Sequence, residues 1–171
     1  MYNYDLTDSA LKAWLRLRQG SEAVEKVLGK DLDRQGSTLA QLDILAALDA
    51  SEKPPTPGHL ADYLFREQHS VSAQLSRMWR AGQVKKTRQK DDQRIVKVSL
   101  TPKGKERLAG IKQTGMGQAR EIVAAALSEQ ELAQFDRLAK KVRDKALERL
   151  EMKAEKLPEG FDVERFEMDI A

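Results

Sequence analysis

KDDQRIVKVSLTPKGKERL, residues 90–108, contains the change from strand spacing to helix spacing of apolar residues that decides the fold. From Val96 to Leu100 every second residue is apolar, which is the pattern of a strand with one buried face. Thr101-Pro102 follows at once, and a threonine before a proline is typical of an N-cap and the first residue of a helix. The stretch therefore predicts a strand that runs directly into a long helix.

The residues just before this stretch predict a second strand and a helix. Residues 84–89 can form the antiparallel partner, and the polar segment 89–93 can form the turn. Residues 67–81 have the apolar spacing of a helix, and Gly82 is the residue type that closes a helix in the left-handed conformation. The pattern indicates a helix followed by a two-stranded hairpin.

Two more helices are expected towards the N-terminus. Apolar residues at helical steps predict a first helix over 6–28, ended by a polar stretch that Gly29 and Gly36 bracket. Thr38 and Gln41 have the spacing of a capping box, so a second helix is expected to begin there.

Three further helices complete the pattern. Thr56-Pro57 opens a short helix to about residue 64, and Thr101-Pro102 opens a long one to about residue 127. Ser128 and Glu131 form a second capping box before a last helix that reaches about residue 156. The fold class is therefore mainly α with a small antiparallel β wing, and its centre is a helix-turn-helix.

Two features leave alternatives open. Gly110, Gly115 and Gly117 weaken the long helix, since each costs about 1 kcal/mol relative to alanine. They indicate either a flexible joint or a simple local break. The tail 157–171 is acidic and apolar, and it either docks on a partner subunit or is disordered.

The basic residues are concentrated in one part of the chain. Residues 64–105 hold 11 Lys and Arg against 3 acidic residues, a net charge of +8, whereas the whole chain carries +3. Such a block is expected of a surface that binds phosphates, although a solvated basic surface has the same composition.

Composition argues against several classes of protein. The chain has no cysteine and only His59 and His69 as histidines, which disfavours thiol chemistry, a zinc site and a catalytic centre. No Gly-rich phosphate loop occurs, so no cofactor is expected. Because the sequence contains neither a secretory signal nor an apolar run of membrane length, we expect a cytoplasmic protein without membrane contact.

With these elements in place, the chain resembles the MarR family of bacterial winged helix-turn-helix transcription regulators. The wing tip has a D-x-R pattern at Asp92 and Arg94, and the following helix starts with T-x-x-G at Thr101 and Gly104. The resemblance spans about residues 6–155. Three stretches carry it, namely TLAQLDILAAL (38–48), HLADYLFREQHSVSAQLSRMWRAGQV (59–84) and KDDQRIVKVSLTPKGKERL (90–108).

The resemblance implies an organisation and a function. Residues 1–35 would be an N-terminal dimerisation helix, 36–101 a winged DNA-binding domain, 102–156 the C-terminal dimerisation helices and 157–171 a tail. The expected function is sequence-specific binding of double-stranded DNA at a pseudopalindromic operator, by a homodimer that acts as a repressor.

The helix over 67–81 is the expected reading element. Val71, Leu75 and Met78 share the face that would pack on the core, and a polar face lies opposite. Because a recognition helix reads base edges with its N-terminal residues, the major-groove candidates come from its first half. These candidates are Gln68, His69, Ser70, Ala73 and Gln74.

The hairpin supplies the other DNA contacts. In the family that the chain resembles, the arginine of D-x-R enters the minor groove and the aspartate orients it, which implies these roles for Arg94 and Asp92. Five nearby cations are expected on phosphates, namely Arg77, Lys85, Lys86, Arg88 and Lys90. The alternative is a solvated hairpin with a local ion pair.

Long apolar stripes on the flanking helices need a second surface, which indicates a twofold partner. Many regulators of the family respond to small aromatic ligands between the dimer helices and the winged domain. Here Trp14, Leu17, Ile44 and Leu45 are the candidate pocket residues, and core or dimer packing is the alternative.

Two positions depart from the family pattern. Glu67 stands where the family often has a capping serine, so the start of the recognition helix should be poorly capped. A glutamate there would also weaken phosphate binding unless Arg66 pairs with it. Leu39 replaces a common proline, which we expect to be neutral.

Overall fold

The computed structural model describes residues 7–150 and has the predicted fold class, mainly helical with one two-stranded antiparallel sheet. Strand β1 pairs with β2 so that Val84 lies opposite Leu100 and Arg88 opposite Val96. The elements in chain order are α1 (Ser9–Arg34), α2 (Leu39–Ala50), α3 (Pro57–Tyr63), α4 (Gln68–Arg80), β1 (Val84–Arg88), β2 (Val96–Leu100), α5 (Pro102–Ala126) and α6 (Glu129–Arg149).

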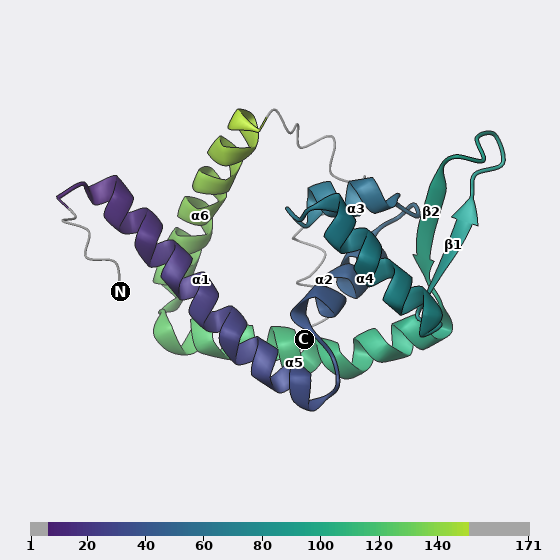
Figure 1. The fold of residues 1–171 in the computed structure, drawn as a ribbon. Coiled ribbons are helices and arrows are strands. Elements are labelled where there is room, and N and C mark those ends of the chain that lie inside the picture. Colours follow the sequence, from purple (N-terminus) through teal and green to yellow (C-terminus); the bar gives the residue numbers. More distant parts are fainter. Residues whose placement is uncertain (1–6, 151–171) are drawn as a thin grey trace.

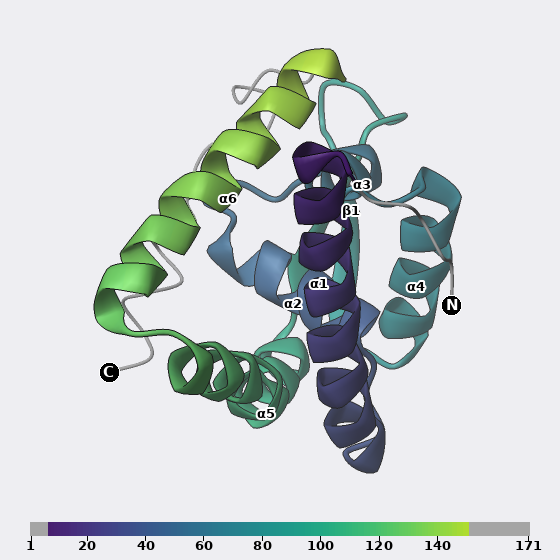
Figure 2. The same ribbon diagram turned by 90° about the vertical axis from the view of Figure 1, so that its left-hand side faces the viewer.

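Helix α5 joins the two parts of the molecule. At one end it follows the wing formed by β1 and β2, and at the other it meets α1 and leads into α6 (Figure 1). Turned by 90°, the molecule shows α5 almost end-on, with α1 and α6 leaving it as separate arms (Figure 2). The helix-turn-helix and its wing thus lie at one side, and two long helices extend from the other.

The core lies where the helix-turn-helix packs on α5 and the wing. Leu45 from α2, Leu60 from α3, Leu75 from α4, Val98 from β2 and Ile111 from α5 are all fully buried in one cluster. Since these residues come from five elements, the core fixes α4 and the wing relative to each other.

The capping residues expected from the sequence begin the helices as predicted. The hydroxyl oxygen of Thr38 accepts from the backbone N–H of Gln41 at 3.2 Å, and Thr56 and Thr101 cap α3 and α5 in the same way. The Thr38–Gln41 box is nevertheless incomplete. The Gln41 amide donates to Gln83 Oε1 at 2.7 Å, which ties α2 to the start of the wing instead.

Helix α1 differs from the prediction at both ends. It begins at Ser9, because the carboxylate of Asp8 accepts from the N–H groups of Ala10 and Leu11. It also continues through Gly29 to Arg34, so the expected end near residue 28 is wrong. Leu32, one turn beyond Leu28, is fully buried, and this packing outweighs the cost of about 1 kcal/mol for a helical glycine.

Helix α5 is continuous, so neither a break nor a non-helical joint occurs at its glycines. A Cβ added at Gly115 would lie 2.3 Å from Leu42 Cδ2, whereas one at Gly110 would meet nothing within 4 Å. Gly115 therefore permits the close approach of α5 to α2. This close approach gives Gly115 a structural role that the sequence analysis did not consider.

The C-terminal end was only partly predicted. Helix α6 is described from Glu129 to Arg149 with Leu150 as its C-cap, and it was expected to reach about residue 156. Residues 151–156 and the tail 157–171 lie outside the described residues, as do residues 1–6. Within residues 7–150, no helix is long and apolar enough to cross a membrane.

Candidate nucleic-acid interface

Helix α4 has the two faces that its sequence predicts. Val71, Leu75 and Met78 are buried on the core, and this anchors the helix along its length. The opposite face is open to solvent. Three major-groove candidates, His69, Ser70 and Ala73, are exposed there together with Arg77 and Arg80. A fourth, Gln68, is exposed at the first residue of the helix, nearer to its buried side.

The fifth candidate, Gln74, lies at the margin of this face and has an intramolecular partner. Arg77 donates from Nε and Nη2 to Gln74 Oε1, at 3.0 and 2.5 Å. The carboxamide oxygen is therefore engaged in the free protein. Reading an adenine with both atoms of this carboxamide requires that Arg77 first turn away, which would suit a contact of Arg77 with phosphate.

A tight turn separates α3 from α4. The backbone N–H of Phe65 donates to the carbonyl of Asp62 at 3.2 Å, and that of Arg66 donates to the carbonyl of Ala61 at 3.0 Å. These bonds form a Schellman motif, in which the residue after the C-cap adopts a positive φ. Here that residue is Phe65, with φ of 50°, and its side chain is exposed.

Replacing Phe65 by glycine should stabilise the protein. A residue with a side chain is destabilised by about 1–2 kcal/mol in the left-handed region, and glycine is not. Against this gain, glycine increases the entropy of the unfolded chain, which costs roughly 0.5–1 kcal/mol of stability. We expect a net gain of about 0.5 kcal/mol in the free energy of unfolding, measured by urea denaturation. A loss of stability in Phe65→Gly would mean that the exposed ring makes a stabilising contact.

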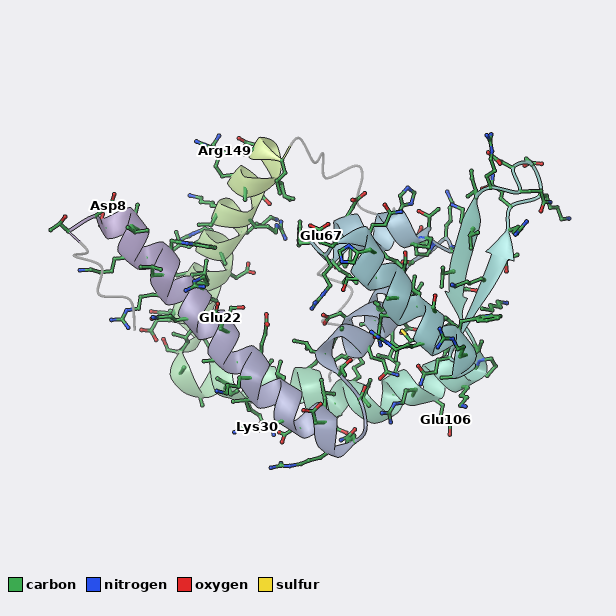
Figure 3. All side chains as sticks on the ribbon, viewed as in Figure 1. Asp8, Glu22, Lys30, Glu67, Glu106 and Arg149 are labelled. Carbon is green, nitrogen blue, oxygen red and sulfur yellow. The ribbon has the colours of Figure 1, made fainter. Side chains whose placement is uncertain are left out.

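The start of α4 has no side-chain cap, as its sequence predicts. Glu67 is the N-cap residue, and its side chain makes no capping hydrogen bond. Figure 3 labels this residue at the start of the helix. The first turn is therefore held by other contacts.

Arg66 does not pair with Glu67, contrary to the arrangement considered from the sequence. Its guanidinium Nη2 donates to Asp43 Oδ2 on α2 at 2.9 Å. Burial raises the pKa of the Asp43 carboxyl above its ordinary value, while the hydrogen bond and charge of Arg66 act in the opposite direction. Desolvation thus outweighs the ion pair at this partly buried site.

The wing presents its cations on two faces. Because paired residues in an antiparallel sheet share a face, Lys86 and Arg88 lie on the face of buried Val98, and Lys85 lies on the other. Lys86 Nζ donates to Ser76 Oγ of α4 at 3.4 Å. Lys86 therefore faces α4, and Lys85 lies on the opposite face of the hairpin.

The wing tip is formed by Asp92 and Arg94. Asp92 Oδ1 accepts from the backbone N–H of Arg94 at 3.0 Å and from its Nε at 3.2 Å. These hydrogen bonds to the carboxylate lower the pKa of Asp92 below its ordinary value. The Arg94 side chain is 92% exposed, so the aspartate orients a guanidinium that extends into solvent.

Residues 35–95, from the end of α1 to the wing tip, match the sequence model described as MarR family. This segment, about a third of the chain, is similar to the MarR family. A comparison with curated protein sequences finds no significant match.

Solved MarR-family structures share this fold. AbsC from Streptomyces coelicolor has a TM-score of 0.74 and 24% identity, over 84% of this chain and 98% of that protein. A mutant of MarR from E. coli, complexed with operator DNA, has a TM-score of 0.70 and 24% identity, over 81% of this chain and 99% of that protein. The regulator RdhR-CbdbA1625, bound to 2,4-dichlorophenol, has a TM-score of 0.73 and 22% identity, over 86% of each chain.

The candidate ligand-pocket residues differ in burial. Ile44 and Leu45 are fully buried residues of the core. Trp14 is largely exposed on α1, and Leu17 is partly buried. Within the described residues, no cluster of His, Cys, Asp or Glu could hold a metal ion.

Two contacts between separate elements were missed by the sequence analysis. The Asp43–Arg66 pair joins residues 23 positions apart, and the Ser76–Lys86 contact joins α4 to the wing. Neither has a signal in spacing or motif, since each depends on how separate elements pack.

Proposed function

We propose that this chain is a sequence-specific transcription regulator, a repressor, that binds a pseudopalindromic DNA operator as a homodimer. The observation that carries the proposal is the exposed polar face of α4 beside a cationic wing, joined by the contact between Ser76 and Lys86. An α-helix fits the major groove, and a hairpin beside it can reach the adjacent minor groove.

In this proposal α4 reads bases with its first half. Gln68, His69, Ser70 and Ala73 are exposed and lie ahead of the basic residues of the helix. Gln68 can pair with the edge of an adenine, and the Ala73 methyl can contact the methyl group of a thymine. Gln74 would join them once Arg77 leaves its carboxamide for a phosphate.

The wing adds the minor-groove and phosphate contacts. Arg94, oriented by Asp92, suits the narrow and strongly negative minor groove of A·T-rich DNA. Lys86 and Arg88 share the wing face nearer to α4, and Lys90 lies in the turn. Lys85 is on the opposite face, so it could contact only a phosphate on the outer side of the hairpin.

The flanking helices supply the proposed dimer interface. Large apolar side chains on both arms are exposed to solvent in the single chain, which a monomer rarely tolerates as continuous patches. A twofold partner would cover them and present two copies of α4 to successive major grooves, about 10 base pairs apart. They are Leu11, Trp14, Val27, Phe135, Leu138, Val142 and Leu150.

A small aromatic effector is a finer part of the proposal. The structurally similar RdhR-CbdbA1625 is described as an organohalide-sensing regulator and has been solved with 2,4-dichlorophenol. Trp14 and Leu17 of α1 offer an incompletely buried apolar surface that could accept such a ring. Ile44 and Leu45 would support the site from within the core.

Selection of bound duplexes from a random pool tests this function. Wild-type protein should enrich an inverted repeat with A·T-rich flanks. Arg94→Ala should enrich the same central bases but lose the preference at the flanks, because its contact lies in the minor groove. We expect Arg94→Ala to bind the selected duplex about 10-fold more weakly, within the roughly 1–3 kcal/mol of a specific contact.

Lys90→Ala is the matched control on the same wing. Loss of a phosphate contact should weaken binding to all duplexes alike and should flatten the salt dependence by about 0.9 log units per log unit. A pool that yields no motif with wild-type protein would refute the proposed function. A flank preference that survives in Arg94→Ala would refute the role of the wing tip alone.

A further inference from the structure

Arg66, the residue before the N-cap of α4, has two separate structural roles. The backbone N–H of Arg66 closes α3 by donating to the carbonyl of Ala61 at 3.0 Å. Its side chain leaves the turn in another direction and donates to Asp43 on α2 at 2.9 Å. Arg66 thus connects the end of α3, the middle of α2 and, through the next residue, the start of α4.

This connection occurs where α4 has the weakest local support. Glu67 gives the helix no side-chain cap, and the first buried residue of α4 is Val71, one turn into the helix. Gln68, His69 and Ser70 lie between them and are exposed. The orientation of this first turn therefore depends on the backbone at residues 65–67, which the Arg66 side chain ties to α2.

Asp43 is a firm attachment point. It lies inside α2, and its immediate neighbours in sequence, Leu42 and Ile44, are buried core residues. The Arg66 and Asp43 side chains are only 39% and 29% exposed, respectively. Solvent therefore screens the attraction between their charges less than it would in a fully exposed pair. Such a pair can fix geometry even where its net contribution to stability is small.

We propose that Arg66 and Asp43 are positioning residues for DNA reading, which hold the uncapped first turn of α4 in register with the bases. The inference rests on the proposed function of the α4 surface. In this role Arg66 contributes to discrimination between sequences and not to general attraction for DNA. Its positive charge is committed to Asp43 and is therefore not one of the phosphate contacts.

The obvious alternative makes an opposite prediction. If Arg66 were a phosphate ligand that Asp43 holds back, removal of Asp43 would release it and strengthen binding to every duplex. Under the positioning role, removal of Asp43 should weaken binding to the operator and leave binding to unrelated DNA nearly unchanged. The sign of the Asp43 effect therefore separates the two.

The experiment compares two duplexes of equal length and base composition, the inverted repeat selected by wild-type protein and a scrambled version of it. The ratio of the two dissociation constants is measured for wild type, Asp43→Ala, Arg66→Ala and the double variant. We expect each single variant to lower this ratio about 10-fold, the scale of one lost base contact. The double variant should lower it no further, because both changes remove the same link.

Three controls keep the outcome clear. Asp49→Ala removes another acid of α2, one that is exposed, and should leave the ratio unchanged. Arg66→Lys keeps the charge and should recover part of the discrimination. Asp43→Leu, which has a similar shape but no acceptor for Arg66, replaces Asp43→Ala if that variant does not fold.

Two results would overturn the inference. One is an unchanged ratio in both single variants while wild type still selects its motif. The other is a fall in the salt slope of about 0.9 in Arg66→Ala with equal weakening on both duplexes, which would identify a phosphate contact. Failure of wild-type protein to select any motif would instead refute the proposed function itself.

Discussion

Gly104→Ala should destabilise the protein by about 3 kcal/mol or more, at the upper end of effects expected from overpacking. A Cβ at this position would lie 2.0 Å from the carbonyl oxygen of Gln83 and 3.3 Å from Leu100 Cδ2. The carbonyl cannot easily move, because it accepts from the N–H of Thr101 at 3.0 Å. The clash therefore falls on backbone at the corner that joins α4 to the wing.

Gly110→Ala is the matched control on the same helix. A Cβ there meets nothing within 4 Å, so the substitution should stabilise α5 by about 1 kcal/mol through helix propensity alone. Thermal or urea unfolding at one fixed protein concentration measures both variants. Equal stability of Gly104→Ala and wild type would show that the corner between Gln83 and Thr101 is wrongly placed.

Leu138→Asp should dissociate the proposed dimer and abolish operator binding. Phe135, Leu138 and Val142 recur at helical steps on one face of α6, and each is about half exposed in the single chain. A carboxylate buried there without a partner is strongly unfavourable, and twofold symmetry places it in the interface twice. We expect self-association to weaken at least about 100-fold, which corresponds to roughly 2.8 kcal/mol.

Ala133→Asp introduces the same charge on the opposite face of α6, where it should have no effect on assembly. Sedimentation of both variants over a range of concentrations measures the dimer constant, and circular dichroism confirms that the helices persist. Because Leu138 is half exposed in the single chain, its replacement should not unfold the subunit. A stable dimer in Leu138→Asp would place the interface elsewhere.

Local chemistry made most of the fold predictable. Thr56-Pro57 and Thr101-Pro102 marked two helix starts because a hydroxyl acceptor and a fixed φ act within one turn of chain. The alternation of apolar and polar residues from Val96 to Leu100 identified the wing strand, because a strand with one buried face has this pattern. The exposed face of α4 was predicted in the same way, from apolar residues spaced at helical steps.

The errors came from packing between distant elements. Gly29 appeared to end α1, yet Leu32 is buried beyond it, and no local pattern reveals that burial. Gly115 was expected to mark either a flexible joint or a local break, but the helix is continuous there and Gly115 makes room for Leu42 of α2. Gln41 was expected to close its own capping box, and it bonds to Gln83 instead.

The candidate site divides in the same way. The Asp92–Arg94 contact spans two residues and was expected from the D-x-R pattern. By contrast, Asp43 could not be connected to Arg66 from sequence, because their contact depends on how α2 packs beside the α3–α4 turn. Short-range pairs are therefore predictable from motifs, and the contacts that orient the recognition helix are not.

The central claim is that α4 and the wing form one DNA-reading surface, used twice by a symmetric dimer. Hydroxyl-radical footprinting of the wild-type protein on the duplex that it selects tests this claim most directly. The account predicts two protected regions related by a twofold axis, with centres about 10 base pairs apart and additional protection at the A·T-rich flanks. A single region without a symmetric copy, or uniform weak protection along the duplex, would contradict it.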